Sequence, residues 1–432
     1  MEKIKEEKKK GRKITKRGFI KISMGMAFAL FLVLTFGGPQ LLAAEPPIKI
    51  GYVSIFSGRV AMLGEEGSKG AQLAIDEINA KGGILGRKME LLTRDSKGKI
   101  EEAVRVARDF VVRDKVDFLM DGSSSRESFA VKEVSRDLKK LTMITASETT
   151  SNTADPKIWT PYSFRTARVA IHDSIVGGYY GAKVSNKLGL KKWYSISPDY
   201  AYGHDNTNLF FEYTKKHKPD IEIIGQQWPK LFEPDYTAHI TKIMKDKPDA
   251  VYSCLWGGDT TAFLEQASLY GLFGRLTFFG INIADPLVIA GLKKGVPAGM
   301  HTGNRYNPTM PDTPANRAFG EKYKKKFGNY PANWSWQAYT AVLLLAESMK
   351  RAGTTDNEKV IKAMEGLTIK APCAHPPNDT VTMRARDHQL IYYTIGWAET
   401  ISESPYVTNR TYLPWEEILK EETAYYKKQG WL

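Results

Sequence analysis

The sequence predicts an α/β fold in which helices cover both faces of parallel sheets. Two observations lead to this prediction. From residue 48 onward, short apolar runs alternate with amphipathic helical patterns, and right-handed crossovers between such strands make them parallel. In addition, 42% hydrophobic and 25% charged residues over 432 positions form an ordinary globular composition, long enough for two or more domains.

The first series of elements begins with an apolar strand at residue 48. The helix that follows carries four apolar residues at helical spacing between Ala71 and Ile78, which gives it one apolar face. Lys81-Gly82-Gly83 then ends the helix, because glycine accepts a left-handed cap. In chain order, the sequence predicts strands over 48–54, 88–94, 116–120 and 141–145, and helices over 67–80, 101–113 and after the strand 116–120.

A second series of strands and helices begins after Arg165 and indicates a second sheet. Beyond Pro297 the sequence is rich in loop residues up to Pro314, and helical patterns then return. The expected strands are 192–197, 250–255, 276–279 and 390–397, and the expected helices are 172–187, 316–327, 335–351, 357–366 and 415–429.

Three consecutive serines, Ser123, Ser124 and Ser125, follow the buried strand 116–120 and Gly122. At the N-terminus of the next helix, their hydroxyls and backbone N–H groups would favour a carboxylate or another anion. Serines at this position also cap helices without binding anything. Ligands of parallel sheets bind beyond the carboxyl ends of the strands, so convergence with the loops 54–64 and 146–150 at one edge favours a ligand site.

Aromatic residues in the exit loops of the second series point to the same kind of site. Tyr200, Tyr202 and Trp256 each follow a predicted strand, where an aromatic ring offers a large rigid face, and in Tyr and Trp one polar group. We therefore expect a binding cleft at this edge.

Catalytic and metal-binding motifs do not emerge from the sequence. The glycines 82–86 follow a helix rather than a strand, and neither a Gly-x-x-x-x-Gly-Lys-Ser/Thr loop nor a Gly-x-Ser-x-Gly elbow occurs. Neither Cys254 and Cys373 nor the seven histidines have metal-ligand spacing. We expect a protein without catalytic residues, cofactor or metal; whether the two cysteines pair is open.

The first 44 residues have the pattern of a cleavable secretory signal. A basic tract over 3–21 precedes an uncharged apolar core over 22–36, and Leu42-Ala43-Ala44 is a small-residue exit before Glu45. An uncleaved anchor would need about 20 apolar residues, but the core is shorter and ends in Gly37-Gly38-Pro39-Gln40.

The signal segment also carries half of the excess positive charge. Ten Lys or Arg and three Glu give it a net charge of +7 out of the total of +14. The remaining basic residues, such as those between Lys322 and Lys326, are typical of a solvated helix face. We therefore expect no nucleic-acid partner.

The mature chain resembles the Leu/Ile/Val-binding family of periplasmic substrate-binding proteins of ABC importers. The resemblance rests on the order and spacing of several stretches that together cover nearly all of it. These are SGRVAMLGEEGSKGAQLAIDEINAKGGILGRKMELLTRD (57–95), DGSSS (121–125), DYAYG (199–203), DAVYSCLWGGDTTAFLEQA (249–267) and VTMRARDHQ (381–389).

The resemblance implies the type I periplasmic binding fold, with two Rossmann-like lobes that are joined by a three-crossover hinge and close on a small solute. With the signal peptide over 1–44, the first lobe would comprise 45–165 plus about 300–370. The second lobe would comprise 166–299 plus about 371–432.

The resemblance also implies a set of ligand-binding residues. Ser123 and the loop residues Ser147, Glu148 and Thr149 would hold a ligand carboxylate, and Tyr202, Trp256 and Leu63 would surround the ligand. Together with the serine turn and the exit-loop aromatics, the expected set is Leu63, Ser123, Ser124, Ser147, Glu148, Thr149, Tyr200, Tyr202, Trp256 and Asn282.

Two departures from the family pattern concern the ligand. Asn282 stands where amino-acid binders place an acidic residue for the ligand ammonium group, and a neutral amide cannot offset a buried ammonium as a carboxylate does. Glu148 stands where the family usually has a small residue; it could replace the missing charge, repel a ligand carboxylate or face solvent. Arg59, where the family often has proline, could change the mouth of the cleft.

The predicted function is that of a periplasmic, monomeric, non-enzymatic binding protein of a branched-chain-amino-acid-type ABC importer. It would bind a small amino acid, organic acid or amide, and Asn282 favours an organic acid or amide with an apolar or aromatic part. Its partner would be an ABC permease in the inner membrane. The alternative is a periplasmic sensor of the same fold that docks on a receptor kinase or chemoreceptor.

Overall fold

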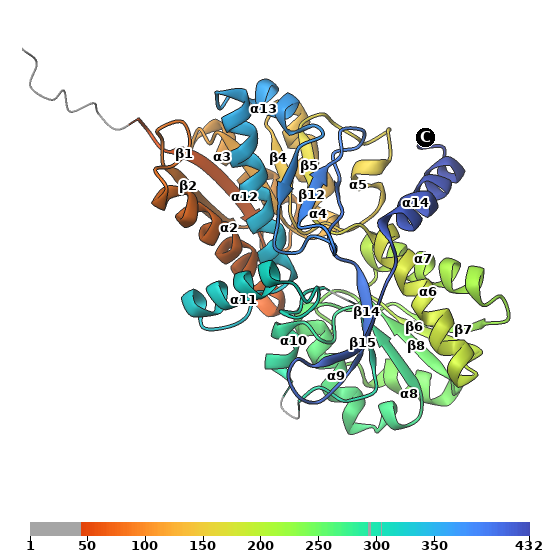
Figure 1. Cartoon of the computed structure of the whole chain (residues 1–432). Helices are drawn as coiled ribbons and strands as arrows, with labels where there is room; N and C mark the ends of the chain where they lie inside the picture. Colours follow the sequence, from red (N-terminus) through yellow and green to blue (C-terminus); the bar gives the residue numbers. More distant parts are fainter. Residues whose placement is uncertain (1–44, 293–294, 304) are drawn as a thin grey trace, which may run out of the picture. The chain divides into compact units, whose positions relative to one another are not determined.

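A computed structural model describes residues 45–292, 295–303 and 305–432 (Figure 1). Residues Pro47–Leu432 form one unit, and the predicted signal segment 1–44 lies outside the described residues. A membrane-spanning helix is not found in the described part of the chain, since none of its helices combines the required length and apolar character.

The first sheet has five parallel strands in the order β2-β1-β3-β4-β5. Residues of β1 and β3 are almost all buried, as expected for central strands covered on both faces. The strands are β1 (Ile48–Ser54), β2 (Met89–Asp95), β3 (Phe118–Gly122), β4 (Thr142–Ile144) and β5 (Ser163–Arg165), and the intervening helices are η1 (Gly58–Val60), α2 (Met62–Ala80), α3 (Ile100–Val112), α4 (Ser125–Asp137) and α5 (Ser151–Ala154).

The second sheet has seven strands in the order β15-β14-β10-β9-β8-β6-β7. The strands from β7 to β10 pair in parallel, and β14 and β15 add an antiparallel edge. The strands are β6 (Lys192–Ile196), β7 (Glu222–Gln227), β8 (Ala250–Ser253), β9 (Thr277–Gly280), β10 (His301–Gly303), β14 (Gly396–Thr400) and β15 (Val407–Tyr412). The helices are α6 (Ala170–Leu188), α7 (Ala201–His217), α8 (Thr237–Asp246), α9 (Gly257–Leu269), η2 (Leu272–Gly274) and α10 (Pro286–Gly291).

The C-terminal part of the chain packs against both sheets and their helices. Helix α12 packs against α2 so closely that a Cβ on Gly70 would lie 2.0 Å from the carbonyl oxygen of Ser335, while α14 packs against α6. A small sheet in the order β11-β12-β13 is joined to β5 through the bridge between Arg165 and Gln389. The elements are α11 (Pro314–Phe327), α12 (Asn333–Ala352), α13 (Asn357–Met364), β11 (Thr368–Lys370), β12 (Thr380–Met383), β13 (Leu390–Ile391) and α14 (Trp415–Gln429).

The chain passes between the two sheets three times: after β5, after β10 and after β13. The first and third crossings contact each other, because Arg168 Nη1 donates to the Thr394 carbonyl oxygen at 3.0 Å and the Val169 N–H donates to Tyr393 Oη at 3.0 Å. We call the elements that pack on β1–β5, with α12, α13 and the small sheet, the five-stranded lobe. Those that pack on the other sheet form the seven-stranded lobe.

The predicted α/β class with parallel sheets is confirmed, and most element positions agree with the structure. Strand 48–54 and helix 415–429 have the predicted bounds, whereas α2 begins at Met62, five residues before the expected start. The expected strand 390–397 is two short strands, because the third crossing interrupts it. Strands β5, β7, β10, β11, β12 and β15 were not predicted. Strands β5 and β10 are only three residues long, and the other four contain half-exposed or exposed residues, which weaken the apolar signal.

The proposed lobe boundaries near residues 300 and 370 stay a prediction. The elements next to those boundaries pair as follows. Strand β10 (His301–Gly303) pairs with β9 and β14 in the seven-stranded sheet, and β12 (Thr380–Met383) pairs with β11 and β13 in the small sheet.

Candidate ligand-binding cleft

A cavity lies where the carboxyl ends of strands from both sheets meet. Its volume is about 30 Å³, because side chains from both lobes meet across it. The lining residues are Leu63, Ser123, Ser124, Ser125, Ala146, Glu148, Tyr200, Tyr202, Trp256, Asn282, Asp285, Arg305, Asn333 and Trp334.

The serine turn combines the two roles that its sequence left open. Ser124 is the N-cap of α4, and both its N–H and its hydroxyl donate to the Glu127 carboxylate, at 3.3 and 2.9 Å. The hydroxyl of Ser123 donates to the buried carboxylate of Asp121. Ser125 differs, since its hydroxyl oxygen accepts from Ser147 at 3.1 Å and no acceptor for its own proton is found among the described residues. The turn therefore offers the Ser125 hydroxyl as a donor to the cavity.

Glu148 and Arg305 form an ion pair in the wall of the cavity. Both side chains are buried, with 4% and 5% of their surface exposed. Asn333 Nδ2 donates to Glu148 Oε1 at 3.1 Å, and Arg305 Nη2 donates to the hydroxyl of Tyr202 at 2.8 Å. Burial lowers the pKa of Arg305 to about 9, so its guanidinium is still charged at neutral pH. Glu148 therefore points inward, and its charge is balanced by Arg305.

The ion pair continues into the chain crossings. Arg305 Nη1 lies 3.8 Å from Asp173 Oδ2, and Asp173 in turn pairs with Arg168. Arg168 also donates to the carbonyl oxygen of Thr394 in the third crossing. Charges of alternating sign thus run from the cavity to the segments that join the lobes.

A second buried carboxylate, Asp285, lines the cavity three residues after Asn282. Its oxygens accept from the backbone N–H groups of Leu287 at 3.0 Å and of Asn333 at 3.3 Å. Burial raises the pKa of Asp285 to about 7. Asn282 itself accepts from Thr260 Oγ1 at 3.3 Å, which leaves its amide N–H₂ group as a donor. The cavity consequently has an acidic group close to Asn282, where this sequence lacks the acidic residue of the amino-acid binders.

Aromatic side chains form the apolar part of the wall. The rings of Tyr200 and Tyr202 stack with centroids 5.7 Å apart, and Trp256 Nε1 donates to the hydroxyl of Tyr200 at 2.8 Å. From the five-stranded lobe, Trp334 meets Trp256 edge to face at 5.8 Å. Burial raises the pKa of both tyrosines well above neutral pH, so both hydroxyls stay protonated.

The lobes also contact each other through Arg59 of η1. Its Nη1 donates to the carbonyl oxygen of Glu233 at 2.5 Å and lies 3.4 Å from Asp259 Oδ1, both of which belong to the seven-stranded lobe. The Arg59 side chain is one-third exposed, whereas Asp259 is buried. Arg59, which stands where the family often has proline, therefore links the two lobes.

Eight of the ten residues that the sequence placed in a ligand site line the cavity, and their binding role stays a prediction. Ser147 and Thr149 are not among the lining residues. Ser147 donates to Ser125 and accepts from Asn152 Nδ2 at 2.7 Å, so it positions Ser125, and the Thr149 carbonyl oxygen accepts from Arg165 at 2.6 Å.

Six lining residues were missing from the predicted set. Ser125 and Ala146 lie in loops that were expected to face the site, and only their individual orientation was missed. Asp285 had one signal, since it follows the strand-exit loop that contains Asn282. Arg305, Asn333 and Trp334 follow no predicted strand, so no sequence pattern indicated them.

Neither metal ligation nor a disulfide is seen in the described residues. No three His, Cys, Asp or Glu side chains in this part of the chain are arranged to hold a metal ion. Cys254 and Cys373 are both buried free thiols. Burial raises the pKa of Cys254 to about 12, so the thiol stays protonated and unreactive.

Comparison with known proteins gives the class of this fold and site. Residues 47–394 match the family described as "Periplasmic binding protein". The chain belongs to this family, whose members are solute-binding rather than enzymatic and act in the periplasm. The resemblance to the Leu/Ile/Val-binding proteins and the predicted type I fold are confirmed.

Two relatives have names that give a ligand class. Leu/Ile/Val-binding protein homolog 4 of Brucella abortus is 25% identical over 364 residues, covering 80% of this chain and 82% of the relative. Leu/Ile/Val-binding protein homolog 1 of Brucella melitensis is 26% identical over 346 residues, covering 78% and 86%.

Solved structures share the fold at lower identity. An ABC transporter solute-binding protein of Rhodopseudomonas palustris, crystallised with 3,4-dihydroxybenzoic acid, has a TM-score of 0.75 at 22% identity and covers 85% of this chain and 97% of its own. A leucine-binding protein of Thermotoga maritima has a TM-score of 0.67 at 20% identity and covers 84% and 97%.

Proposed function

We propose that this protein is the solute-binding component of an ABC importer and captures a small carboxylate-bearing solute with an apolar or aromatic body. The observation that carries this proposal is the cavity between the lobes, which combines stacked aromatic rings with the Glu148–Arg305 pair. Aromatic walls with few, well-placed polar groups are typical of small-molecule sites.

The polar groups of the cavity favour particular parts of the solute. Ser125 at the N-terminus of α4 suits a carboxylate, because its hydroxyl has a proton to donate and helix N-termini favour anions. Glu148 and Asp285 suit a hydrogen-bond donor such as an ammonium or an amide. This arrangement supports an amino acid alongside the organic acid or amide favoured by Asn282. The named ligands of the relatives, which are branched-chain amino acids and benzoic acids, all carry a carboxylate.

Closure of the lobes would couple binding to transport. Side chains of both lobes meet across a cavity of only about 30 Å³, so the solute would enter with the lobes apart and be enclosed when they close. A solute drives this change only by binding the closed form better than the open one. The signal segment would direct export of the mature chain. The closed form would then dock on an ABC permease.

The experiment is a solute screen on ligand-stripped mature protein by thermal shift and calorimetry. Leucine, isocaproate and isocaproamide share one carbon skeleton and differ only in their polar groups; phenylalanine, hydrocinnamate and benzoate extend the series to aromatic bodies. We expect at least one carboxylate-bearing member to raise the melting temperature, because a ligand that binds only the folded state stabilises it.

Two results would contradict the proposal. If no member of the series shifts the melting temperature, the solute-binding role loses its support. If only uncharged solutes bind, the carboxylate-bearing class is wrong. Neighbouring permease and ATPase genes would support import, and a neighbouring receptor-kinase gene would support the sensory alternative.

A further inference from the structure

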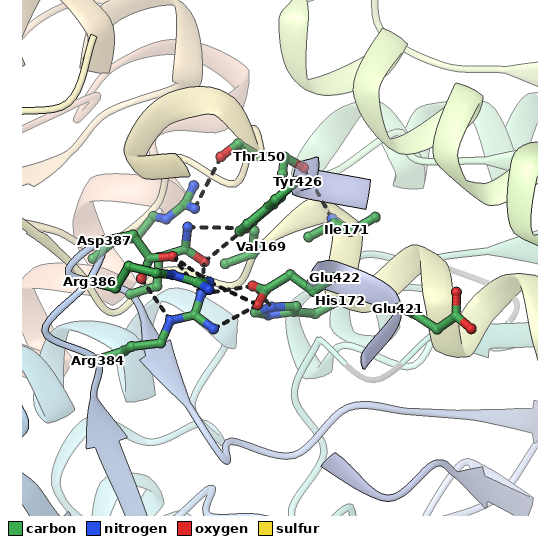
Figure 2. Close-up of polar contacts among 12 residues, drawn as sticks. Thr150, Val169, Ile171, His172, Arg384, Arg386, Asp387, Glu421, Glu422 and Tyr426 are labelled. Carbon is green, nitrogen blue, oxygen red and sulfur yellow. Dashed lines mark hydrogen bonds and ion pairs between the residues drawn. The ribbon is translucent and has the colours of Figure 1, made fainter. Parts of the chain in front are cut away.

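The carboxylate of Glu422, on the C-terminal helix α14, is fully buried among cationic and imidazole groups (Figure 2). It lies 2.7 Å from His172 Nε2 and accepts from Arg384 Nη1 at 2.6 Å and Nη2 at 2.8 Å. Arg386 Nη2 is a further donor at 3.4 Å. Glu422 therefore joins three residues through one carboxylate.

These partners belong to different lobes. His172 is on α6, which packs with α7 and β14 in the seven-stranded lobe. Arg384 and Arg386 follow β12 of the small sheet, which is joined to β5 of the five-stranded lobe. One helical turn after Glu422, Tyr426 exchanges hydrogen bonds with Gln389 at 3.2 and 3.3 Å. Helix α14 thus packs on one lobe and bonds to the other.

The contacts of Glu422 lie beside the segments in which the chain crosses between the sheets. His172 Nδ1 is 3.0 Å from Tyr393 Oη, which also accepts from the Val169 N–H at 3.0 Å. Val169 and Tyr393 belong to the first and third crossings. A rotation of the lobes about these crossings would change the distances from Arg384 and Arg386 to His172, and hydrogen bonds weaken steeply with distance and angle.

The electrostatics keep Glu422 ionised. Burial alone would raise its pKa, but His172 and Arg384 overcome that effect and hold the pKa well below its usual range. Arg384 is also held by Asp387, through Nε at 2.8 Å and Nη2 at 2.6 Å. Removing the Glu422 charge would therefore still leave Arg384 with an ionic partner.

The preceding residue, Glu421, provides a contrast on the same helix. Its carboxylate pairs with Lys216 of α7 at 2.5 Å, and its carbonyl oxygen accepts from Tyr213 of α7 at 3.5 Å. Both partners belong to the seven-stranded lobe. Figure 2 shows the Glu421 side chain directed away from the Glu422 cluster.

We propose that Glu422 makes α14 a strap between the lobes that favours their closed arrangement, and so sets solute affinity from outside the cavity. This inference rests on the proposed solute-binding function. Glu422, Arg384 and Arg386 are not among the residues that line the cavity, so they would act as positioning residues. Because a solute is retained only while the lobes are closed, a weaker strap lowers affinity without removing a ligand contact.

The test compares Glu422→Gln with Glu421→Gln in the mature chain. We expect Glu422→Gln to increase the radius of gyration in small-angle scattering without solute, to weaken solute affinity about 3- to 10-fold, or both. Glu421→Gln, which removes one charge from the same helix, should change neither quantity. Arg386→Gln, at an exposed position, should act in the same direction as Glu422→Gln with a smaller effect.

Circular dichroism and melting curves identify variants that fold. Folded Glu422→Gln with the scattering and affinity of Glu421→Gln would overturn the strap. If Glu422→Gln does not fold, Arg386→Gln decides the question by the same comparison. If no solute binds the wild type, the proposed function fails, and scattering of the unliganded variants still decides whether α14 ties the lobes together.

Discussion

Arg305 and Glu148 pair across the wall of the cavity, although one follows strand β10 and the other follows strand β4. The pair makes this part of the site neutral overall, with a cation and an anion both within reach of a solute. It also connects the site to the crossings through Asp173 and Arg168. Of the roles that the sequence left open for Glu148, exposure to solvent is excluded, since the residue is buried in the cavity wall.

Glu148→Gln distinguishes the two roles that are left. If the carboxylate holds a solute ammonium, leucine should lose about tenfold in affinity relative to isocaproate, because a charge-assisted hydrogen bond is lost. If the carboxylate repels the solute carboxylate, both solutes should bind more tightly in parallel. Calorimetry with both solutes measures the ratio. The control is Glu347→Gln, which changes a partly exposed glutamate on α12 outside the cavity. This variant should leave the ratio of leucine to isocaproate affinity unchanged, and a change would mean that the ratio does not report on Glu148.

Replacing each of the three serines of the turn by alanine should distinguish their effects on solute affinity from their effects on stability. Ser125→Ala should weaken binding of a carboxylate solute by about fivefold with little change in stability, since it removes the available hydroxyl donor. Ser124→Ala should lower the free energy of unfolding by about 1 kcal/mol, because Ser124 caps α4. Titration calorimetry and urea denaturation measure the two effects. Equal losses of affinity for all three variants would argue against a special role of Ser125.

Ser123→Ala tests whether Ser123 holds the ligand carboxylate, as the family resemblance implies. Its hydroxyl donates to Asp121, whose pKa is raised by burial. Because this hydroxyl already has an acceptor, we expect Ser123→Ala to affect affinity less than Ser125→Ala does. The same calorimetric series measures both, and a larger loss for Ser123→Ala would restore Ser123 as the main ligand contact.

Asp285 should make stability depend on pH in a defined direction. Its folded-state pKa of about 7 lies above the value of about 4 expected in the unfolded chain, so the folded state binds more protons between these values. Relative to Asp285→Asn, the wild-type free energy of unfolding should be highest below about pH 4 and fall as pH rises to about 7. Above that pH the difference should be level. Urea denaturation of both proteins across this range measures it, and a difference that increases with pH would contradict the buried-carboxyl assignment.

The contact of Arg59 with Asp259 and Glu233 should contribute to closure in a salt-dependent way. Because Arg59 is partly exposed, we expect Arg59→Ala to weaken solute binding only about two- to threefold at low ionic strength. The difference from wild type should shrink in high salt, which screens exposed charges. Binding isotherms at two salt concentrations measure this. A loss of the same size in both salts would indicate a packing role for the Arg59 side chain instead.

Local patterns in the sequence determined much of the fold and part of the site. The alternation of apolar strands and amphipathic helices specified parallel sheets, because burial on both faces requires continuous apolar strands. The strand-exit rule located the serine turn, the loop with Glu148 and the aromatic loops, since these positions depend only on where each strand ends. The missing acidic residue at Asn282 was also visible in the sequence.

Tertiary structure alone decided which charges meet. Arg305, Asn333 and Trp334 reach the cavity because the chain crosses between the sheets three times and returns α12 to the first sheet. Glu422 reaches His172 and Arg384 for the same reason. Ion pairs and aromatic contacts form between segments that are distant in sequence, so their partners follow from the path of the whole backbone rather than from local periodicity.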